Sequence, residues 1–160
     1  MIKIRALPAA LAAGAIATLA AVLPAHGQVS AQTRTLTFTS AEKHGDERAI
    51  DTRPKGPSVG DRWLLASTLR QAGKPAGRLE ADCVGIDKTY DVLQCTVVVI
   101  LRDGRLTLHG ASVSKPIPGV GGTGEEYAIT GGTGAYQGAT GTMTRRGNDK
   151  RDTLTFTLAS

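Results

Sequence analysis

Short segments in which apolar and polar residues alternate recur through residues 28–160. A period of two is typical of a β-strand with one buried face, and helical periodicity is almost absent from this stretch. The alternation predicts eight strands, at about residues 33–39, 61–70, 77–86, 92–102, 105–113, 125–131, 139–146 and 151–159.

Turn signals separate these segments. Asp103-Gly104 and Gly147-Asn148-Asp149 are typical of tight hairpin turns. Eight short strands with short connections favour an all-β fold, an eight-stranded antiparallel closed barrel, because closure removes the exposed sheet edges. A β-sandwich is the alternative. Two irregular segments are expected on the surface, a long polar loop at 40–60 and a loop rich in proline and glycine at 115–124.

The first 27 residues have the organisation of a secretory signal peptide. Lys3 and Arg5 precede an uncharged stretch, Ala6–Leu23, that is mostly Ala, Leu, Ile and Val, and small residues follow it. A membrane anchor is the alternative, although the stretch is shorter than the ~20 residues that span a bilayer and a proline and a glycine interrupt it.

We therefore expect residues 1–27 to be removed, with cleavage as late as Ala31. The expected product is a secreted or periplasmic protein, outside the cytoplasm, with no membrane segment and a single barrel domain over 28–160. The formal charge of +5 for the whole chain falls to +3 when Lys3 and Arg5 are removed.

The remaining bases do not favour a nucleic-acid partner. They are scattered, and aromatic residues make up only 4% of the chain, so no basic stripe is interleaved with stacking rings. The two pairs Arg145-Arg146 and Lys150-Arg151 are interpreted as a solvated hairpin turn.

Cys83 and Cys95 predict a disulfide. An even number of cysteines in an exported protein is usually paired. The polar segment 86–91 lies midway between them, and a hairpin folded there places the two cysteines opposite each other on neighbouring strands. The alternative is two reduced thiols that face a cavity.

Strand phase assigns an inward, apolar face to the barrel. Small residues on that face, Ala81, Gly85 and Gly110, lie beside the large Trp63 and fit either a residual pocket or a tapered core. We expect a small apolar ligand in the lumen. The predicted ligand-binding residues are Trp63, Leu65, Ser67, Leu79, Ala81, Cys83, Val97, Leu106, Leu108 and Ser112.

Other candidates for chemistry are weaker. His44, with Glu42, Asp46 and Glu47, lies in a polar loop and is interpreted as a solvated charged segment, so no metal site and no cofactor is predicted. His109 is expected to face outward. The sequence identifies no catalytic residue.

The most distinctive string is ITGGTGAYQGATG, residues 129–141. Its glycine spacing is not that of a dinucleotide fingerprint, because no helix pattern follows. It resembles the ITGGSGxFxGxxG stretch of plant allene oxide cyclases and the VGGTGxFxxAxG stretch of dirigent proteins. Three further segments are similar to the cyclases, namely 59–61 to their LGD, 82–86 to their GLCVLI and 106–111 to their ISVQGA.

This resemblance implies an eight-stranded barrel with an apolar lumen, assembled as a homo-oligomer, a trimer or a dimer. The reactive groups do not transfer. Ser112 stands where the cyclases have a lumen tyrosine, and residues 35–40 contain neither Glu nor Asn. Only Cys83 matches, and lumen Asp and Arg residues of the dirigent kind have no assigned equivalents.

Two hypotheses follow. In the first, an exported barrel binds a small apolar molecule in its lumen and directs its cyclisation or coupling. In the second, the barrel is a non-catalytic structural or interaction scaffold, with function on the 40–60 loop or on an oligomer face.

Overall fold

The computed structural model describes residues 33–41, 47–52, 54–115, 124–148 and 151–159. The predicted signal peptide lies outside them. Among these residues, no helix is long and apolar enough to cross a membrane. The strands are β1 Thr33–Ala41, β2 Glu47–Ile50, β3 Arg62–Gln71, β4 Lys74–Gly85, β5 Val92–Leu101, β6 Gly104–Val113, β7 Gly124–Gly134, β8 Thr140–Asn148 and β9 Arg151–Ala159.

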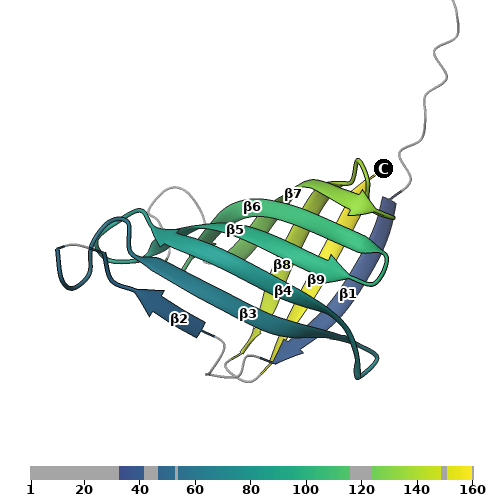
Figure 1. Ribbon diagram of the computed structural model, residues 1–160, viewed down its shortest axis with the longest axis horizontal. Coiled ribbons are helices and arrows are strands. Elements are labelled where there is room, and N and C mark those ends of the chain that lie inside the picture. The colour runs from purple at the N-terminus through teal and green to yellow at the C-terminus, as the bar shows by residue number, and fades with distance from the viewer. Residues whose placement is uncertain (1–32, 42–46, 53, 116–123, 149–150, 160) are drawn as a thin grey trace, which may run out of the picture. The chain divides into compact units, whose positions relative to one another are not determined.

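These strands confirm the predicted closed barrel (Figure 1). From β3 to β9 each strand pairs antiparallel with the next along the chain. The first strand, β1, pairs with β9 on one side and with the end of β3 on the other. A ring of eight strands results, which matches the eight predicted from alternation.

The ninth strand, β2, lies inside the segment expected to be a loop at 40–60. It pairs with β3 from Arg62 to Leu65, whereas β1 pairs with β3 from Thr68 to Arg70. The same edge of β3 is therefore shared by two short pairings. A strand of only four residues gives a weak alternation signal. The signal of β2 was hidden further by the polar composition of the segment around it.

Asp61 organises the rest of that segment. Its buried carboxylate accepts hydrogen bonds from the backbone and hydroxyl of Thr52, from the backbone and hydroxyl of Ser58, and from the hydroxyl of Tyr90. The bond from Tyr90 is the main reason that the pKa of Asp61 lies well below its ordinary value. Burial and the same bond raise the pKa of Tyr90. The turn before β3 is thus bonded to the hairpin between β4 and β5.

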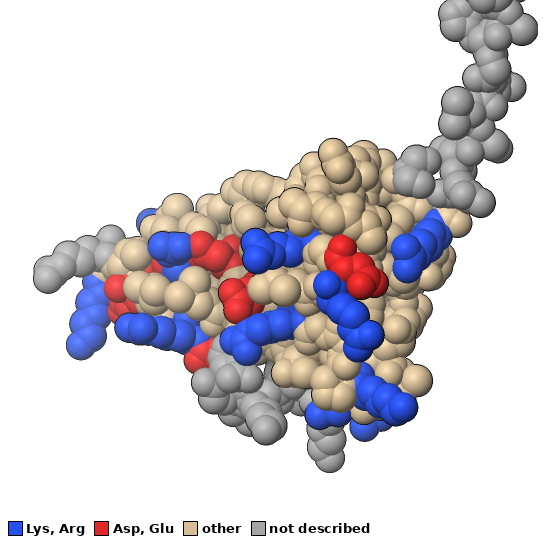
Figure 2. All heavy atoms as spheres, turned by 45° about the vertical axis from the view of Figure 1, so that its right-hand side comes forward, with Lys and Arg blue, Asp and Glu red and all other residues tan. Residues whose placement is uncertain are grey.

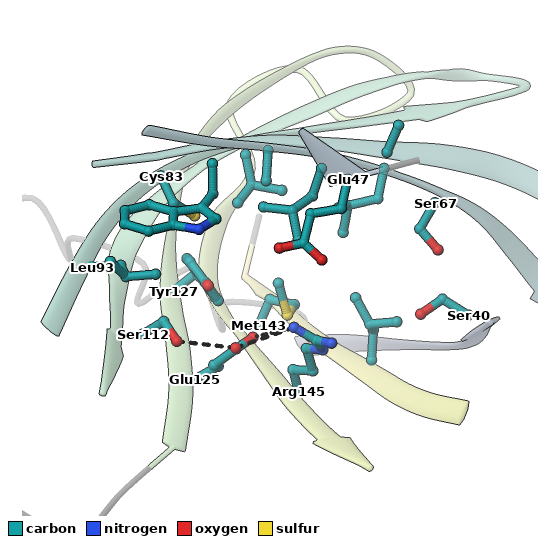
Figure 3. Close-up of a pocket in the computed structure, with 17 residues that line it drawn as sticks. Ser40, Glu47, Ser67, Cys83, Leu93, Ser112, Glu125, Tyr127, Met143 and Arg145 are labelled. Atoms are coloured by element: carbon teal, nitrogen blue, oxygen red, sulfur yellow. Dashed lines mark hydrogen bonds and ion pairs between the residues drawn. The ribbon is translucent and has the colours of Figure 1, made fainter. Parts of the chain in front are cut away.

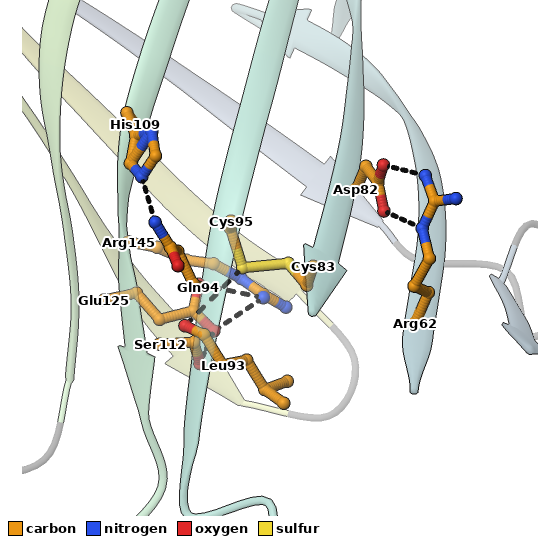
Figure 4. The surroundings of a disulfide bond; sticks show 10 residues. All are labelled: Arg62, Asp82, Cys83, Leu93, Gln94, Cys95, His109, Ser112, Glu125 and Arg145. Carbon is orange, nitrogen blue, oxygen red and sulfur yellow. Dashed lines mark hydrogen bonds and ion pairs between the residues drawn. A yellow bond between two sulfur atoms is a disulfide. The ribbon is translucent and has the colours of Figure 1, made fainter. Parts of the chain in front are cut away.

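That hairpin carries the predicted disulfide. Cys83 and Cys95 occupy directly opposed positions of β4 and β5, with Cα atoms 4.0 Å apart, and their sulfurs are bonded. The prediction of a paired hairpin is confirmed, and the alternative of two free thiols is wrong. Both residues lie on the inner face of the wall (Figure 4).

The interior is filled at one end of the barrel only. The filled end contains the β3–β4, β5–β6 and β7–β8 turns, and its side chains include Leu69, Val99, Leu106 and Phe156, all fully buried. Phe38 and Phe156 meet edge to face there, with ring centroids 5.7 Å apart. The opposite end, where the Cys83–Cys95 hairpin turns, holds the cavity described below. A second, more open pocket lies at the rim of the filled end, with Leu36, Ala76 and Tyr136 in its wall.

The glycine string closes the filled end. After β7 the chain turns back over residues 135–138 and buries Tyr136. Gly132 is required because a Cβ there would collide with the backbone of Tyr136, and Gly134 has a φ of +62°, which glycine adopts without strain. The string is therefore a structural turn that lets an aromatic ring pack on the strand ends.

Basic and acidic side chains are interspersed on the face seen in Figure 2. Examples are the ion pairs Arg62–Asp82 and Arg78–Glu80, which join residues more than a third exposed and so contribute little to stability.

Candidate functional site

A cavity of about 220 Å³ occupies the hollow end of the lumen (Figure 3). Every strand of the barrel contributes to its wall, and β2 adds Glu47. The lining residues are Ser40, Glu47, Trp63, Leu65, Ala66, Ser67, Leu79, Ala81, Cys83, Leu93, Val97, Ser112, Glu125, Tyr127, Met143, Arg145 and Leu154.

Eight of the ten residues predicted to bind a ligand line this cavity: Trp63, Leu65, Ser67, Leu79, Ala81, Cys83, Val97 and Ser112. Leu106 and Leu108 also point inward, but they are buried in the filled half and do not line the cavity. Strand phase distinguishes inside from outside but not the filled end from the hollow end, so it does not separate these two leucines from the residues of the cavity wall.

Of the three small inward residues that fit either a residual pocket or a tapered core, only Ala81 lines the cavity. A Cβ on Gly85 would meet the rings of Tyr90 and Trp63, and a Cβ on Gly110 would lie 2.9 Å from the ring of Tyr127. Both glycines therefore make room for neighbouring aromatic rings. The ring of Tyr90 also packs edge-on against Trp63, with centroids 4.6 Å apart.

A charged cluster forms one wall, and it corrects the interpretation of Arg145 as part of a solvated turn. The Nη1 of Arg145 lies 3.1 Å from both carboxylate oxygens of Glu125, and its Nη2 lies 2.6 Å from Oδ2 of Asp152. The hydroxyl of Ser112 donates to Oε1 of Glu125 over 3.1 Å. The side chains of Arg145 and Glu125 are only 27% and 22% exposed.

Tyr127 stands next to this cluster on β7. Burial, followed by the nearby charge of Glu125, raises the pKa of Tyr127 above its ordinary value. A tyrosine hydroxyl is protonated at neutral pH even with its ordinary pKa, so this one can donate a hydrogen bond, and the raised pKa keeps it neutral in more alkaline solution. Together, Glu125 and Tyr127 offer an acceptor and a donor to a molecule in the lumen.

Two serines form a second polar region of the cavity wall. Ser67 of β3 and Ser40 of β1 are both buried, and Figure 3 places their hydroxyls on the side of the cavity away from Ser112 and Leu93. The wall between these two polar regions is apolar, with Leu65, Leu79 and Val97 among its residues.

Glu125, Tyr127 and Arg145 were not among the predicted site residues, although the sequence carries a signal for them. Glu125, Tyr127 and Ile129 alternate with three outward residues in β7, as Met143 and Arg145 do in β8. Phase applied to these two strands places a carboxylate and a guanidinium inside the barrel. Their charge hid them, because no charged residue was expected to face inward.

The proposed solvated cluster around His44 lies mostly outside the described residues; Glu47 alone is described, and it lines the cavity from β2. Within the described part of the chain, no group of three or more His, Cys, Asp or Glu could hold a metal ion. His109 faces outward as predicted, with its Nε2 2.8 Å from the side-chain amide of Gln94.

No protein-family model matches the chain, and no curated protein is significantly similar to it in sequence. Solved structures are similar in fold. A pyocyanin demethylase superposes with a TM-score of 0.62 at 23% identity, over 78% of this chain and 99% of that one. The dirigent protein GePTS1, a pterocarpan synthase, gives 0.59 at 15% identity, over 80% and 83%. The Diels-Alderase AbmU from Streptomyces koyangensis gives 0.59 at 12% identity, over 83% and 70%.

The chain therefore shares the barrel fold of these proteins, and its lumen is hollow, with polar groups on two parts of the wall. The resemblance seen in the glycine string is confirmed at the level of the fold.

Proposed function

We propose that this domain binds a small, mainly apolar ring molecule in its lumen and directs the cyclisation or coupling of that molecule. The observation that carries the proposal is the cavity of about 220 Å³, whose walls are apolar between two polar regions. Sites of this composition are typical of small-molecule binding.

The volume sets the size of the ligand. An apolar cavity of roughly 150 Å³ accommodates benzene. By the same scale, the cavity here suits a ligand with on the order of ten non-hydrogen atoms, a molecule of one or two rings.

The charged wall orients such a ligand. Glu125 accepts one bond from Ser112 and two from Arg145, and a carboxylate has about four acceptor positions. A ligand donor can therefore reach Glu125, while Tyr127 donates to a ligand acceptor. Arg145 positions the carboxylate.

A lumen of this kind accelerates a reaction by holding one reactive conformer, and such positioning can contribute on the order of several kcal/mol. Cyclisation rearranges bonds within the bound molecule and requires no added reactant. The fold is shared with a Diels-Alderase and with a cyclase whose reported reaction is a [4 + 2] cycloaddition, which supports a ring-forming reaction here.

Binding can be tested with naphthalene and quinoline, which have the predicted size. Trp63 is the only tryptophan and lines the cavity, so the ¹⁵N-labelled protein has one indole N–H signal that reports on the lumen. We expect both probes to shift it saturably. Ala81→Leu should weaken the binding at least tenfold by filling the lumen, whereas Ala128→Leu, on the exposed face of β7, should not. No saturable shift, or equal binding by the two variants, contradicts the proposal.

The second hypothesis, a non-catalytic scaffold, makes the opposite prediction. Native mass spectrometry of the protein from its own source would then show a protein partner and no small molecule. A co-purified molecule of one or two rings supports lumen binding, and its conversion to a ring-closed product in the presence of the protein tests the reaction. The same spectra report whether the domain forms the expected trimer or dimer.

We also propose that the domain acts outside the cytoplasm. The Cys83–Cys95 disulfide supports this, because such bonds persist in oxidising compartments. Sequencing the N-terminus of the secreted protein tests it: a start at residue 28, or as late as 32, is expected, and a retained residue 1 contradicts it.

A further inference from the structure

Ser67 is a buried hydroxyl in the wall of an apolar cavity. It lies on β3 between the inward-facing Leu65 and Leu69, and only 7% of its surface is exposed. Its Oγ is buried, and no described residue gives that oxygen a hydrogen-bond partner. Buried polar atoms are almost always hydrogen-bonded, so an unpaired one in a cavity wall calls for a specific explanation.

The inward-facing neighbours of Ser67 on its own strand and on β4 are apolar. Its cross-strand partner on β4 is Leu79, and the nearest inward residues along β3 are leucines. Ser40, on β1, pairs with Leu69, two residues along β3 from Ser67, and lines the same cavity. An alanine or a valine would satisfy packing at position 67 without leaving an oxygen unpaired, so packing does not account for the serine.

The position of Ser67 relative to the charged wall follows from the topology. In the ring of eight strands, β3 and β7 are four places apart in both directions, so they form opposite walls. Ser67 stands on β3, and Glu125 and Tyr127 stand on β7. A ligand that crosses the lumen therefore meets the carboxylate and the phenol on one side. On the other it meets the hydroxyls of Ser67 and Ser40 and, from β2 beside β3, the carboxylate of Glu47; of these three side chains, Ser67 has the buried oxygen without a partner among the described residues.

We propose that Ser67 is a specificity-determining residue of the lumen, which donates a hydrogen bond to an acceptor atom, a ring nitrogen or a carbonyl oxygen, at the end of the ligand opposite Glu125. This inference rests on the proposed lumen binding and adds the substrate class: a molecule of one or two rings with an acceptor on the β3 side. A molecule without that acceptor leaves the Ser67 hydroxyl unpaired and is discriminated against.

Quinoline and naphthalene test this directly, because they have the same shape and differ by one ring nitrogen, which is a neutral acceptor at pH 8. Affinities are measured from the Trp63 indole signal for the wild type, Ser67→Ala, Ala128→Leu and Tyr127→Phe. The quantity compared is the ratio of quinoline affinity to naphthalene affinity, which cancels changes common to both probes. We expect Ser67→Ala to lower this ratio about tenfold and Ala128→Leu, on the exposed face of β7, to leave it within about twofold. A fall of the ratio in Tyr127→Phe instead would assign the ring nitrogen to the phenol.

A second measurement does not depend on any ligand. Ser67→Ala removes an unpaired hydroxyl, so its melting temperature should equal or exceed that of the wild type. Ser112→Ala is the matched control, since its hydroxyl donates to Glu125 and its loss should lower the melting temperature. A clear loss of stability in Ser67→Ala would show that the hydroxyl has a partner within the protein and would overturn the inference.

The outcomes separate the two proposals. If neither probe binds the wild type, both lumen binding and the role of Ser67 are wrong. If both probes bind and the affinity ratio is the same in Ser67→Ala, or if the ratio falls with Tyr127→Phe instead, lumen binding stands and the role of Ser67 is wrong.

Discussion

The guanidinium of Arg145 lies against the carboxylate of Glu125 on the inner surface of the barrel, with Nη1 3.1 Å from each of its oxygens. An ion pair in that position is shielded from water by the wall around it. This ion pair therefore contributes to the stability of the fold and also fixes the position of Glu125 in the cavity wall. The exposed ion pairs on the outer face do neither.

Arg145→Met should lower the free energy of unfolding by about 2 kcal/mol, because it leaves the carboxylates of Glu125 and Asp152 without their charged donor. Urea denaturation measures this. Arg146→Met, at the adjacent exposed position, is the control and should change the value by less than about 0.5 kcal/mol. Equal effects of the two substitutions would contradict the structural role of Arg145.

Gly110→Ala should destabilise the barrel by roughly 1–3 kcal/mol, because overpacking forces neighbouring groups apart. The added Cβ would lie 2.5 Å from the carbonyl oxygen of Glu126 and 2.9 Å from the ring of Tyr127. Gly131→Ala is the matched control on the neighbouring strand, since its nearest contact would be at 3.5 Å. Thermal unfolding of the two variants should differ clearly, and similar melting temperatures would disprove the packing argument.

Replacing the cysteines as a pair, Cys83→Ala with Cys95→Val, should cost about 3 kcal/mol, the value expected for a loop closed over a sequence separation of 12. Guanidinium denaturation measures the loss. A reducing agent should destabilise the wild type by a similar amount and leave the double variant unchanged. A reductant effect on the double variant would show that the loss arises elsewhere.

Asp61 should make the fold resistant to acid. Its pKa in the folded protein lies below the ordinary value of 3.8, so its stabilising effect is complete above that value and disappears as the pH falls through the lower, folded-state pKa. Asp61→Asn should therefore lower stability at neutral pH and flatten its decline below about pH 4. Melting temperatures measured from pH 2 to pH 7 test this, and parallel profiles for variant and wild type would contradict it.

Tyr90 should act at the other end of the pH range. Its pKa is raised above 10.0 in the folded protein, so the stability gained from the neutral phenol is complete below pH 10 and is lost as the pH rises through the folded-state pKa. Tyr90→Phe keeps the ring that packs on Trp63 and removes the hydroxyl. The variant should be less stable at neutral pH and should show a weaker alkaline decline than the wild type.

The fold could be read from the sequence because alternation is a strong signal when one face of each strand is buried. It gave the eight barrel strands and the inner faces of β3 to β6, and the spacing of Cys83 and Cys95 gave the disulfide. The four-residue β2 was missed because its pairing depends on β3 being exposed at that edge, which is a property of the assembled barrel.

The site was only half predictable. Its apolar side chains follow from phase, and so do Glu125 and Arg145 once polar residues are allowed to face inward. The identity of the hollow end could not be predicted. It depends on how far Tyr136 and the residues around Phe156 fill the lumen, and no local pattern reports that volume.

The pairing of β1 with β9 places Thr33 opposite Ala159, so the start of the first barrel strand lies beside the end of the last. Every strand pair except the two made by β1 joins sequence neighbours, and the pairing of β1 with β9 joins the first barrel strand to the last. In such a ring, the order in which the chain connects the strands can change while the strands keep the same neighbours. A circular permutant that links these neighbouring strands and opens the chain at the exposed Ala72-Gly73 turn would retain every strand pairing and the lumen that the strands enclose.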